Sequence, residues 1–205
     1  MTTRTLAVVS AGLGQPSSTS LLAARLSAAA TRELSRHGVQ TEVTTIELRE
    51  HAHDLTDNLL TFFASESLQA AKDAVARADG LIALTPIFSA SYTGLFKTFF
   101  DLLDDHALAG TPVLLGATAG TARHSLALEH TIRPLFSHLR ALTTPTAVFA
   151  ASEDWGADRS IEGGLAARID RAATEFATLV ADRAPTATRD PFDDPIPFEQ
   201  LLGGA

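Results

Sequence analysis

The stretch that decides the fold is residues 81–103, which read LIALTPIFSASYTGLFKTFFDLL. Its first four residues are apolar, which is typical of a strand buried on both faces of a sheet. Residues 93–103 place apolar side chains at helical spacing and predict an amphipathic helix. Between strand and helix lie a proline, several hydroxyl side chains and two aromatic rings. A simple turn of the chain does not require these residue types, so the loop is a candidate binding segment.

The same alternation of strand and helix continues on both sides of this stretch. Strands are predicted at residues 5–10, 41–48, 81–85, 111–118 and 143–151, and helices at 19–37, 65–78, 93–103, 123–141 and 164–184. Strict alternation indicates right-handed crossovers in a parallel sheet that helices cover on both faces. The sequence therefore predicts an α/β fold, a flavodoxin-like three-layer sandwich with a five-stranded parallel sheet.

Composition limits the classes of function. The chain has 205 residues, no cysteine and a formal net charge of −8, with one lysine beyond residue 72. The missing cysteines exclude disulfide scaffolds, thiolate metal sites and cysteine nucleophiles. The acidic balance argues against a nucleic-acid partner. With no apolar run of signal-peptide or membrane-span length, we expect a soluble, cytoplasmic protein and no membrane partner.

We expect one domain over residues 1–184. The remaining residues, 185–205, hold four prolines and four acidic side chains together with Phe192 and Phe198. Proline rules out a long helix in this segment. Two interpretations stay open: a C-terminal tail, or an arm whose phenylalanines pack on a neighbouring subunit.

In a doubly wound sheet, ligands bind outside the carboxyl ends of the strands. The first such loop, residues 10–20, reads SAGLGQPSSTS and leads into a helix N-terminus, where unpaired N–H groups and the helix dipole favour an anion. It lacks the lysine of a nucleoside-triphosphate loop and the third glycine of a dinucleotide loop. Its hydroxyls fit the phosphate of flavin mononucleotide (FMN), although one of them alone would serve as a plain helix cap.

The loops after the third and fourth strands complete the candidate site. Pro86 and the extended residues behind it present backbone polar groups edge-on, as the polar rim of an isoalloxazine ring requires. Phe88 and Tyr92 supply apolar walls, and Gly94 lets the next helix begin without a side chain in the ligand's path. Residues 117–122, ATAGTA, would close over the ring or form an ordinary strand-to-helix turn.

Residues 85–103, together with ATAGTARHSLALEHTIRPLF at 117–136, resemble the NADPH-dependent FMN reductase family. Within it, the sequence is similar to the reductase components of two-component flavin monooxygenases, such as the alkanesulfonate type. The resemblance runs from Leu6 to about Ala150. It implies the following cofactor-binding residues: Ser10, Ser17, Ser18, Thr19, Pro86, Ile87, Phe88, Ser89, Thr118, Ala119, Gly120 and Thr121.

The resemblance also assigns a place to Tyr92. In the two-component reductases a tyrosine at this position interrupts the helix with an inserted residue and a π-helical turn near the subunit interface, which implies a gating or stacking role for Tyr92. This chain departs from the family pattern at two points. Many relatives have an arginine in the first loop, where this chain has Gly14 and Gln15, and Phe88 replaces a common tyrosine.

The activity implied is an NAD(P)H-dependent FMN reductase, with hydride transfer from NADPH or NADH to N5 of FMN and reduced FMN passing to a partner flavin-dependent monooxygenase. Because the two cofactors carry the chemistry, we expect no essential catalytic side chain and no metal. The family implies a homodimer or homotetramer. Two alternatives use the same fold and flavin: an NAD(P)H quinone or azo-type reductase, and a non-enzymatic flavodoxin-like electron carrier.

Overall fold

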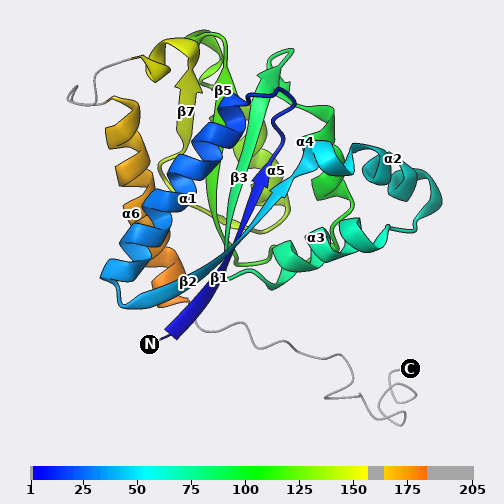
Figure 1. Ribbon diagram of the computed structural model, residues 1–205, viewed down its shortest axis with the longest axis horizontal. Coiled ribbons are helices and arrows are strands. Elements are labelled where there is room, and N and C mark those ends of the chain that lie inside the picture. Colours follow the sequence, from blue (N-terminus) through cyan, green and yellow to red (C-terminus); the bar gives the residue numbers. More distant parts are fainter. Residues whose placement is uncertain (1, 157–163, 184–205) are drawn as a thin grey trace, which may run out of the picture.

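A twisted sheet forms the middle layer of the protein (Figure 1). In this computed structural model the described residues are 2–156 and 164–183. The sheet runs in the order β2-β1-β3-β5-β6, with β7 also pairing with β5 and β4 pairing with β3. The strands are β1 (Thr2–Ser10), β2 (Val39–Glu47), β3 (Gly80–Phe88), β4 (Ser91–Tyr92), β5 (Pro112–Ala119), β6 (Leu142–Thr143) and β7 (Val148–Ala151).

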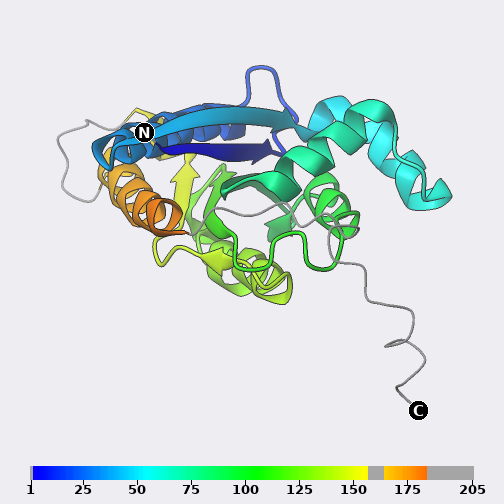
Figure 2. The same cartoon turned by 90° about the horizontal axis from the view of Figure 1, so that it is seen from below.

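Helices cover both faces of the sheet, which confirms the expected three-layer α/β sandwich (Figures 1 and 2). Side chains alternate along each strand, so Leu6 and Val8 join one buried cluster whereas Ala7 and Val9 join the other. The first cluster includes α1 (Ser18–Arg36) and α6 (Leu165–Asp182). The second includes α3 (Glu66–Arg77), α4 (Gly94–Asp101) and α5 (Arg133–His138).

Three helices begin at a hydroxyl side chain that accepts a hydrogen bond from the backbone N–H three residues on. The caps are Ser17 of α1, Ser65 of α3 and Thr93 of α4, with O···N distances of 3.1, 3.2 and 3.4 Å. Each satisfies a donor that the first turn of a helix leaves unpaired. Beyond α1, Gly38 has φ +75°, the left-handed conformation that commonly follows a helix and that glycine adopts at little cost.

The sheet has seven strands rather than five, because β4 is added and the predicted strand at 143–151 is divided in two. Pro145 has no N–H to donate to a ladder, and the chain leaves the sheet around it. Arg133 binds the backbone there instead, with Nη1 2.8 Å from the Thr144 carbonyl oxygen and Nη2 3.1 Å from that of Pro145. The flanking pieces, β6 and β7, both pair with β5.

Two further elements were not expected from the sequence. The 3₁₀ turn Leu48–His51 and helix α2 (Ala52–Thr61) follow β2, in a polar stretch for which we predicted no regular element. Helix α2 buries only Leu55 and Asn58 and exposes its other large apolar side chains. A short helix with one buried leucine gives a weaker signal in the sequence than the longer helices that pack along the sheet.

The π-helical turn lies at a different place from the one that the resemblance implied. Tyr92 belongs to β4, pairs with Ile87, and precedes the regular helix α4. The π turn is Leu128–Ile132, between the 3₁₀ turn Ala122–His124 and α5, so the helix predicted at 123–141 is irregular. Pro134 explains this irregularity, since its missing N–H and its ring disrupt the hydrogen bond to residue 130.

The expected C-terminal segment, residues 185–205, lies outside the described residues. Among helices in the part of the chain that the structure describes, none combines the length and apolar character required to span a membrane.

Buried phenylalanines hold α4 and α5 against the sheet. The Phe100 ring centroid lies 4.7 Å from that of Phe96, 5.4 Å from that of Phe99 and 4.9 Å from that of Phe136, and all four side chains are buried. We predict that Phe100→Ala lowers the free energy of unfolding by about 3–5 kcal/mol, measured by urea denaturation, because it leaves a cavity. Phe88→Ala, at a half-exposed position, should cost less than about 1 kcal/mol; equal losses would contradict the packing described.

Candidate active site

The sheet register brings the three loops together at one edge, the upper edge in Figure 1. Ser10, the last residue of β1, pairs with Leu84 in β3, and Pro86 pairs with Thr118 in β5. The loops that follow these strands therefore emerge side by side. On the other flank of Ser10 lies Glu47, the last residue of the edge strand β2.

In the first loop the predicted hydroxyls divide into distinct roles. Ser17 caps α1, and Thr19 is buried with its hydroxyl 2.7 Å from that of Thr118. The buried Ser10 hydroxyl lies 3.4 Å from the backbone nitrogen of Gly12 and 3.3 Å from the Ser20 hydroxyl. Ser18 is exposed at the first position of the helix. Of the predicted phosphate-loop hydroxyls, that of Ser18 is therefore the most accessible to a ligand.

Gly12 lets this loop close tightly over the start of α1. A Cβ atom at this position would lie 2.1 Å from Oγ of Ser17 and 3.2 Å from Oγ of Ser20. Any larger residue would push the cap away from the helix. The first turn therefore keeps backbone N–H groups that have no intrahelical partner, including those of Ser18 and Thr19, at the mouth of the loop.

The second loop is a tight hairpin between β3 and β4. Its two turn residues, Ser89 and Ala90, have φ angles of 47° and 67°, the left-handed pair that a two-residue hairpin turn requires. Thr85 fastens the base of the hairpin, because its hydroxyl accepts a hydrogen bond from the Thr93 N–H at 3.1 Å. Ile87 points into the core and offers a ligand only its backbone, whereas Phe88 is 51% exposed.

The third loop lies beside the hairpin and the start of α1. Thr118 is buried and bonded to Thr19, Ala119 is half-buried, and Gly120 is exposed. Thr121 accepts a hydrogen bond from the Arg123 N–H at 3.4 Å and so begins the 3₁₀ turn. The structure thus brings all three predicted loops to one place and leaves Gly120 and Thr121 at its rim.

Sequence reasoning missed two charged residues at the first loop. With the Gln15 amide turned so that its oxygen accepts, the two terminal nitrogens of Arg49 lie 2.9 and 2.7 Å from that oxygen. Glu47 accepts a hydrogen bond from the Ser20 hydroxyl at 3.1 Å. Both follow from topology, since β2 is the neighbour of β1 and residues just past its carboxyl end must lie beside the first loop. The arginine absent from the loop itself is thus replaced in space by Arg49.

The site fits a flavin phosphate by its donor set. It offers first-turn N–H groups, the Ser18 hydroxyl and one guanidinium, which are the kinds of donor that can bind a phosphate monoester. The fold defines a flavodoxin-like α/β protein in which these three loops meet at the carboxyl edge of the sheet.

Comparisons with known proteins identify the family within this class to which the chain belongs. The sequence model of the family described as NADPH-dependent FMN reductase matches residues 4–156. The chain belongs to this family, and it is an oxidoreductase that uses FMN and a nicotinamide nucleotide.

Two relatives and one solved structure are similar to this chain over most of its length. An FMN reductase (NADPH) from Pseudomonas aeruginosa is 41% identical over 86% of this chain and 92% of its own length. The NADH-dependent FMN reductase SfnE from Pseudomonas putida is 40% identical over 83% and 89%. The crystal structure of an oxidoreductase from Corynebacterium diphtheriae superposes with a TM-score of 0.85 at 47% identity and covers 90% of this chain and 100% of that one.

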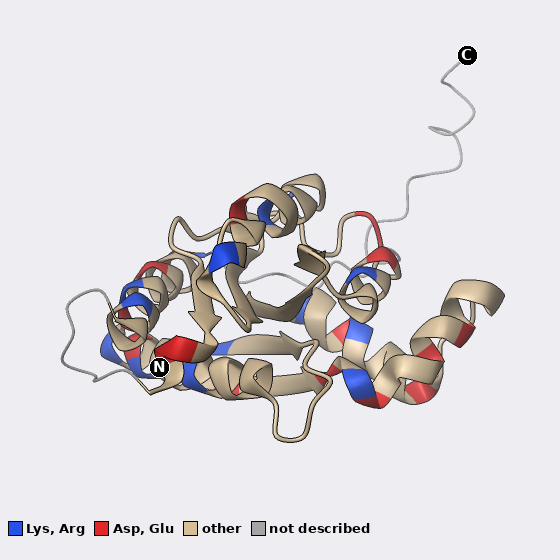
Figure 3. Ribbon diagram, turned by 90° about the horizontal axis from the view of Figure 1, so that it is seen from above, with Lys and Arg blue, Asp and Glu red and all other residues tan. Residues whose placement is uncertain are grey.

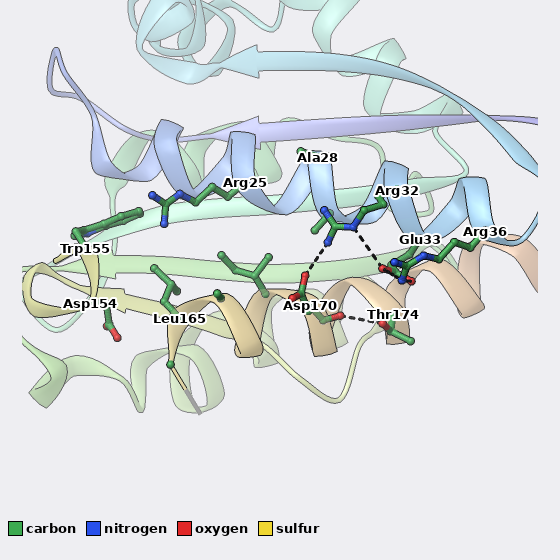
Figure 4. Close-up of a pocket in the computed structure, with 14 residues that line it drawn as sticks. Arg25, Ala28, Arg32, Glu33, Arg36, Asp154, Trp155, Leu165, Asp170 and Thr174 are labelled. Carbon is green, nitrogen blue, oxygen red and sulfur yellow. Dashed lines mark hydrogen bonds and ion pairs between the residues drawn. The ribbon is translucent and has the colours of Figure 1, made fainter. Parts of the chain in front are cut away.

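A separate groove of about 790 Å³ lies between α1 and α6, away from these loops (Figure 4). Its cationic side chains are engaged locally: Arg32 pairs with Asp170 at 2.7 Å, and the Arg25 guanidinium lies 5.1 Å from the centre of the Trp155 ring. The groove therefore contributes nothing to the loop site. Residues 2–156 and 164–183 contain no cluster of three or more His, Asp or Glu side chains suited to a metal.

The Thr19–Thr118 hydrogen bond makes a testable contribution to stability. We predict that Thr19→Val lowers the free energy of unfolding by about 1–3 kcal/mol, because the isosteric change leaves the buried Thr118 hydroxyl unpaired. The double variant T19V/T118V should be more stable than the sum of the single losses predicts, a coupling that a double-mutant cycle measures. Ser18→Ala, at the exposed neighbour, should change stability by less than about 0.5 kcal/mol. Strictly additive effects would refute the coupling.

Proposed function

We propose that the three loops bind FMN as a substrate, that NADPH or NADH reduces it there, and that reduced FMN leaves for a flavin-dependent monooxygenase. The observation that carries the proposal is the meeting of three segments at one edge: the hydroxyl-rich start of α1, the β3–β4 hairpin and the end of β5, whose Thr118 bonds Thr19 of α1 at 2.7 Å and pairs with Pro86 of β3. This arrangement places donors for a phosphate next to an extended, proline-led segment that can line a flat ring.

The phosphate would be held at the first loop. The N–H groups of Ser18 and Thr19 have no intrahelical partners in the first turn, and the helix dipole adds positive potential at the same point. The Ser18 hydroxyl and the Arg49 guanidinium supply two further donors. Ser10 and Ser17 act indirectly, because their hydroxyls hold the loop in shape.

The ring would be held by Pro86, Ile87, Phe88 and Ser89, with Thr118, Ala119, Gly120 and Thr121 closing the opposite side. The exposed Phe88 gives this segment an apolar surface, and the backbone groups around it remain available to the polar edge of a flavin. Tyr92 is half-buried and its ring centroid lies 5.9 Å from that of Phe96, so it supports the hairpin from below. We assign it a positioning role.

The protein contributes orientation rather than acid or base catalysis. When bound, FMN supplies the hydride acceptor and the nicotinamide nucleotide supplies the donor. The loops of this chain fix where the two rings meet and exclude water from the contact. Arg49 is one cation beside a dianionic phosphate, with Glu47 near it, a combination that favours modest affinity. Modest affinity suits a flavin that must leave after each turnover.

Names of relatives support FMN as the reducible substrate, and they include both NADPH-dependent and NADH-dependent enzymes. We therefore keep both nucleotides as donors. Free reduced FMN needs a consumer, and a monooxygenase that takes flavin from solution fits that need. We place the activity in the cytoplasm, where reduced nicotinamide nucleotides are held, and assign it to a single domain over residues 1–184.

The proposal predicts saturable oxidation of NADPH or NADH that depends on added FMN, followed by stopped-flow absorbance. Turnover with FMN should exceed turnover with a quinone, and the purified protein should release flavin on dilution. Faster reduction of a quinone with retained flavin would instead assign a quinone or azo-type reductase. Tightly held flavin without nucleotide oxidation would assign an electron carrier.

A second prediction isolates the phosphate contacts. Arg49→Gln and Ser18→Asp should each raise the KM for FMN about tenfold or more, because one removes a charge-assisted donor and the other adds a repelling charge. The KM for riboflavin, which has no phosphate, should stay within about twofold. Arg77→Gln, an exposed arginine on α3, serves as the matched control. Equal effects on FMN and riboflavin would show that neither residue meets the phosphate.

A further inference from the structure

Two arginines adjoin the three loops of the site. Arg49 lies beside the first loop, where its guanidinium contacts the Gln15 amide, and Arg123 stands in the 3₁₀ turn Ala122–His124 that follows the third loop. Figure 3 looks down on this edge of the sheet and shows Lys and Arg at scattered positions rather than in one basic patch. Recognition of an anion here therefore depends on individual side chains. Arg49 serves the FMN phosphate in the proposed site, which leaves Arg123 without a role.

The Arg123 guanidinium is unpaired. Its side chain is exposed and makes no ion pair or hydrogen bond within residues 2–156 and 164–183. The next acidic residue along the chain, Glu129, is held by Arg133, whose Nε and Nη2 lie 2.6 and 2.9 Å from its two carboxylate oxygens and keep the pKa of Glu129 below its usual value. Glu153, exposed in the loop after β7, forms no ion pair with Arg123 either. In a chain of net charge −8, a guanidinium kept clear of carboxylates is available to an anionic ligand.

The turn that carries Arg123 is fixed at both ends. The Thr121 hydroxyl accepts a hydrogen bond from the Arg123 N–H at 3.4 Å, and the Ser125 N–H donates to the Ala122 carbonyl oxygen at 3.0 Å. Just before the turn, the buried Thr118 is bonded to Thr19 of α1. A ligand that binds Arg123 therefore has to order little more than the arginine side chain itself, which keeps the entropic cost of binding low.

The two nicotinamide nucleotides differ in a group that such an arginine can recognise. NADPH carries a phosphate monoester on the 2′-oxygen of its adenosine ribose, where NADH has a hydroxyl. A phosphate monoester carries nearly two negative charges at neutral pH, and its oxygens match the two-pronged guanidinium. Sites that prefer the 2′-hydroxyl commonly use a carboxylate, and those that accept the 2′-phosphate use an arginine. The pyrophosphate, which both nucleotides share, is commonly held by backbone N–H groups instead.

The strand order leaves room for two bound phosphates. Arg49 follows β2 and Arg123 follows β5, and the strands β1 and β3 lie between them. Adjacent strands are about 4.8 Å apart, so the ends of β2 and β5 are separated by about 14 Å. This separation exceeds the distance of about 8 Å over which exposed charges interact strongly at physiological ionic strength. An FMN phosphate at Arg49 would therefore repel a second phosphate at Arg123 only weakly.

We propose that Arg123 binds the 2′-phosphate of NADPH and so makes this chain prefer NADPH to NADH. The exposed ring of the adjacent His124 can donate a further hydrogen bond. Arg123 follows residues 118–121 in the chain, so it lies beyond the part of the third loop that would close over the flavin ring. The use of this nucleotide as a hydride donor rests on the proposed function, whereas binding of its adenosine half can be measured without flavin.

The first test measures binding to the full chain in the absence of flavin. Adenosine 2′,5′-bisphosphate and adenosine 5′-monophosphate differ only in the 2′-phosphate, and both are anions, so general attraction of charge is present in both titrations. By isothermal titration calorimetry, wild-type protein should bind the bisphosphate at least about tenfold more tightly. Arg123→Gln should abolish this difference, and Arg123→Lys should restore only part of it, because a lysine lacks the two-pronged geometry.

Arg171→Gln, at an exposed arginine on α6, is the matched control and should keep the wild-type difference between the two nucleotides. Equal affinity of wild-type protein for the bisphosphate and the monophosphate overturns the proposal. A preference for the bisphosphate that survives Arg123→Gln overturns it as well, because the 2′-phosphate would then be bound elsewhere.

The second test measures FMN-dependent oxidation of each nucleotide. Wild-type protein should have a lower KM for NADPH than for NADH. Arg123→Gln should raise the KM for NADPH about tenfold or more and leave kcat, the KM for NADH and the KM for FMN within about twofold, because the contact lies away from the reacting rings. A similar rise in the KM for both nucleotides would place Arg123 at the shared pyrophosphate and overturn the proposal, as would a wild type that prefers NADH.

The two tests separate this inference from the flavin function on which its catalytic meaning rests. If no nucleotide is oxidised in the presence of FMN, the proposed function fails. The calorimetric comparison of the bisphosphate with the monophosphate still decides whether Arg123 binds the 2′-phosphate.

Discussion

A buried hydrogen bond between the hydroxyls of Thr19 and Thr118 joins the start of α1 to the carboxyl end of β5. It crosses over the end of β3, so it sets the position of the first loop relative to the hairpin that begins at Pro86. Both partners are buried, and a hydroxyl left alone there would be costly. The site therefore depends on two uncharged side chains that no ligand needs to touch.

Much of this architecture was predictable, because the strands of a doubly wound sheet are apolar runs and its helices are amphipathic, and the two patterns alternate visibly in the sequence. The elements that escaped prediction are short or bury few apolar side chains. Helix α2 exposes most of its apolar side chains, and the pair Ser91–Tyr92 is too short to show alternation. Proline explains the other differences: Pro145 divides a strand, and Pro134 follows the π turn that was expected near Tyr92.

In the candidate site, too, residue types predicted the general chemistry, whereas the role of each side chain became clear only from its packing. Hydroxyls in the first loop predicted a phosphate site, yet the sequence could not say that Ser17 caps α1 or that Thr19 is turned inward. Arg49 was overlooked because it is far from the loop in the chain and enters through strand order. Phe62 and Phe63, just after α2, look like core residues in the sequence, yet they are 86% and 82% exposed in the part of the chain that the structure describes.

The hairpin turn at Ser89 and Ala90 bears on how the flavin site works mechanically. Neither residue is glycine, yet both sit at positive φ, at a cost of about 1–2 kcal/mol each. In the proposed flavin site this strained turn ends the segment that would line the ring. Backbone strain stored in the turn lowers the free energy needed to displace that segment, so we expect it to be the part of the site that moves most readily when the ring departs.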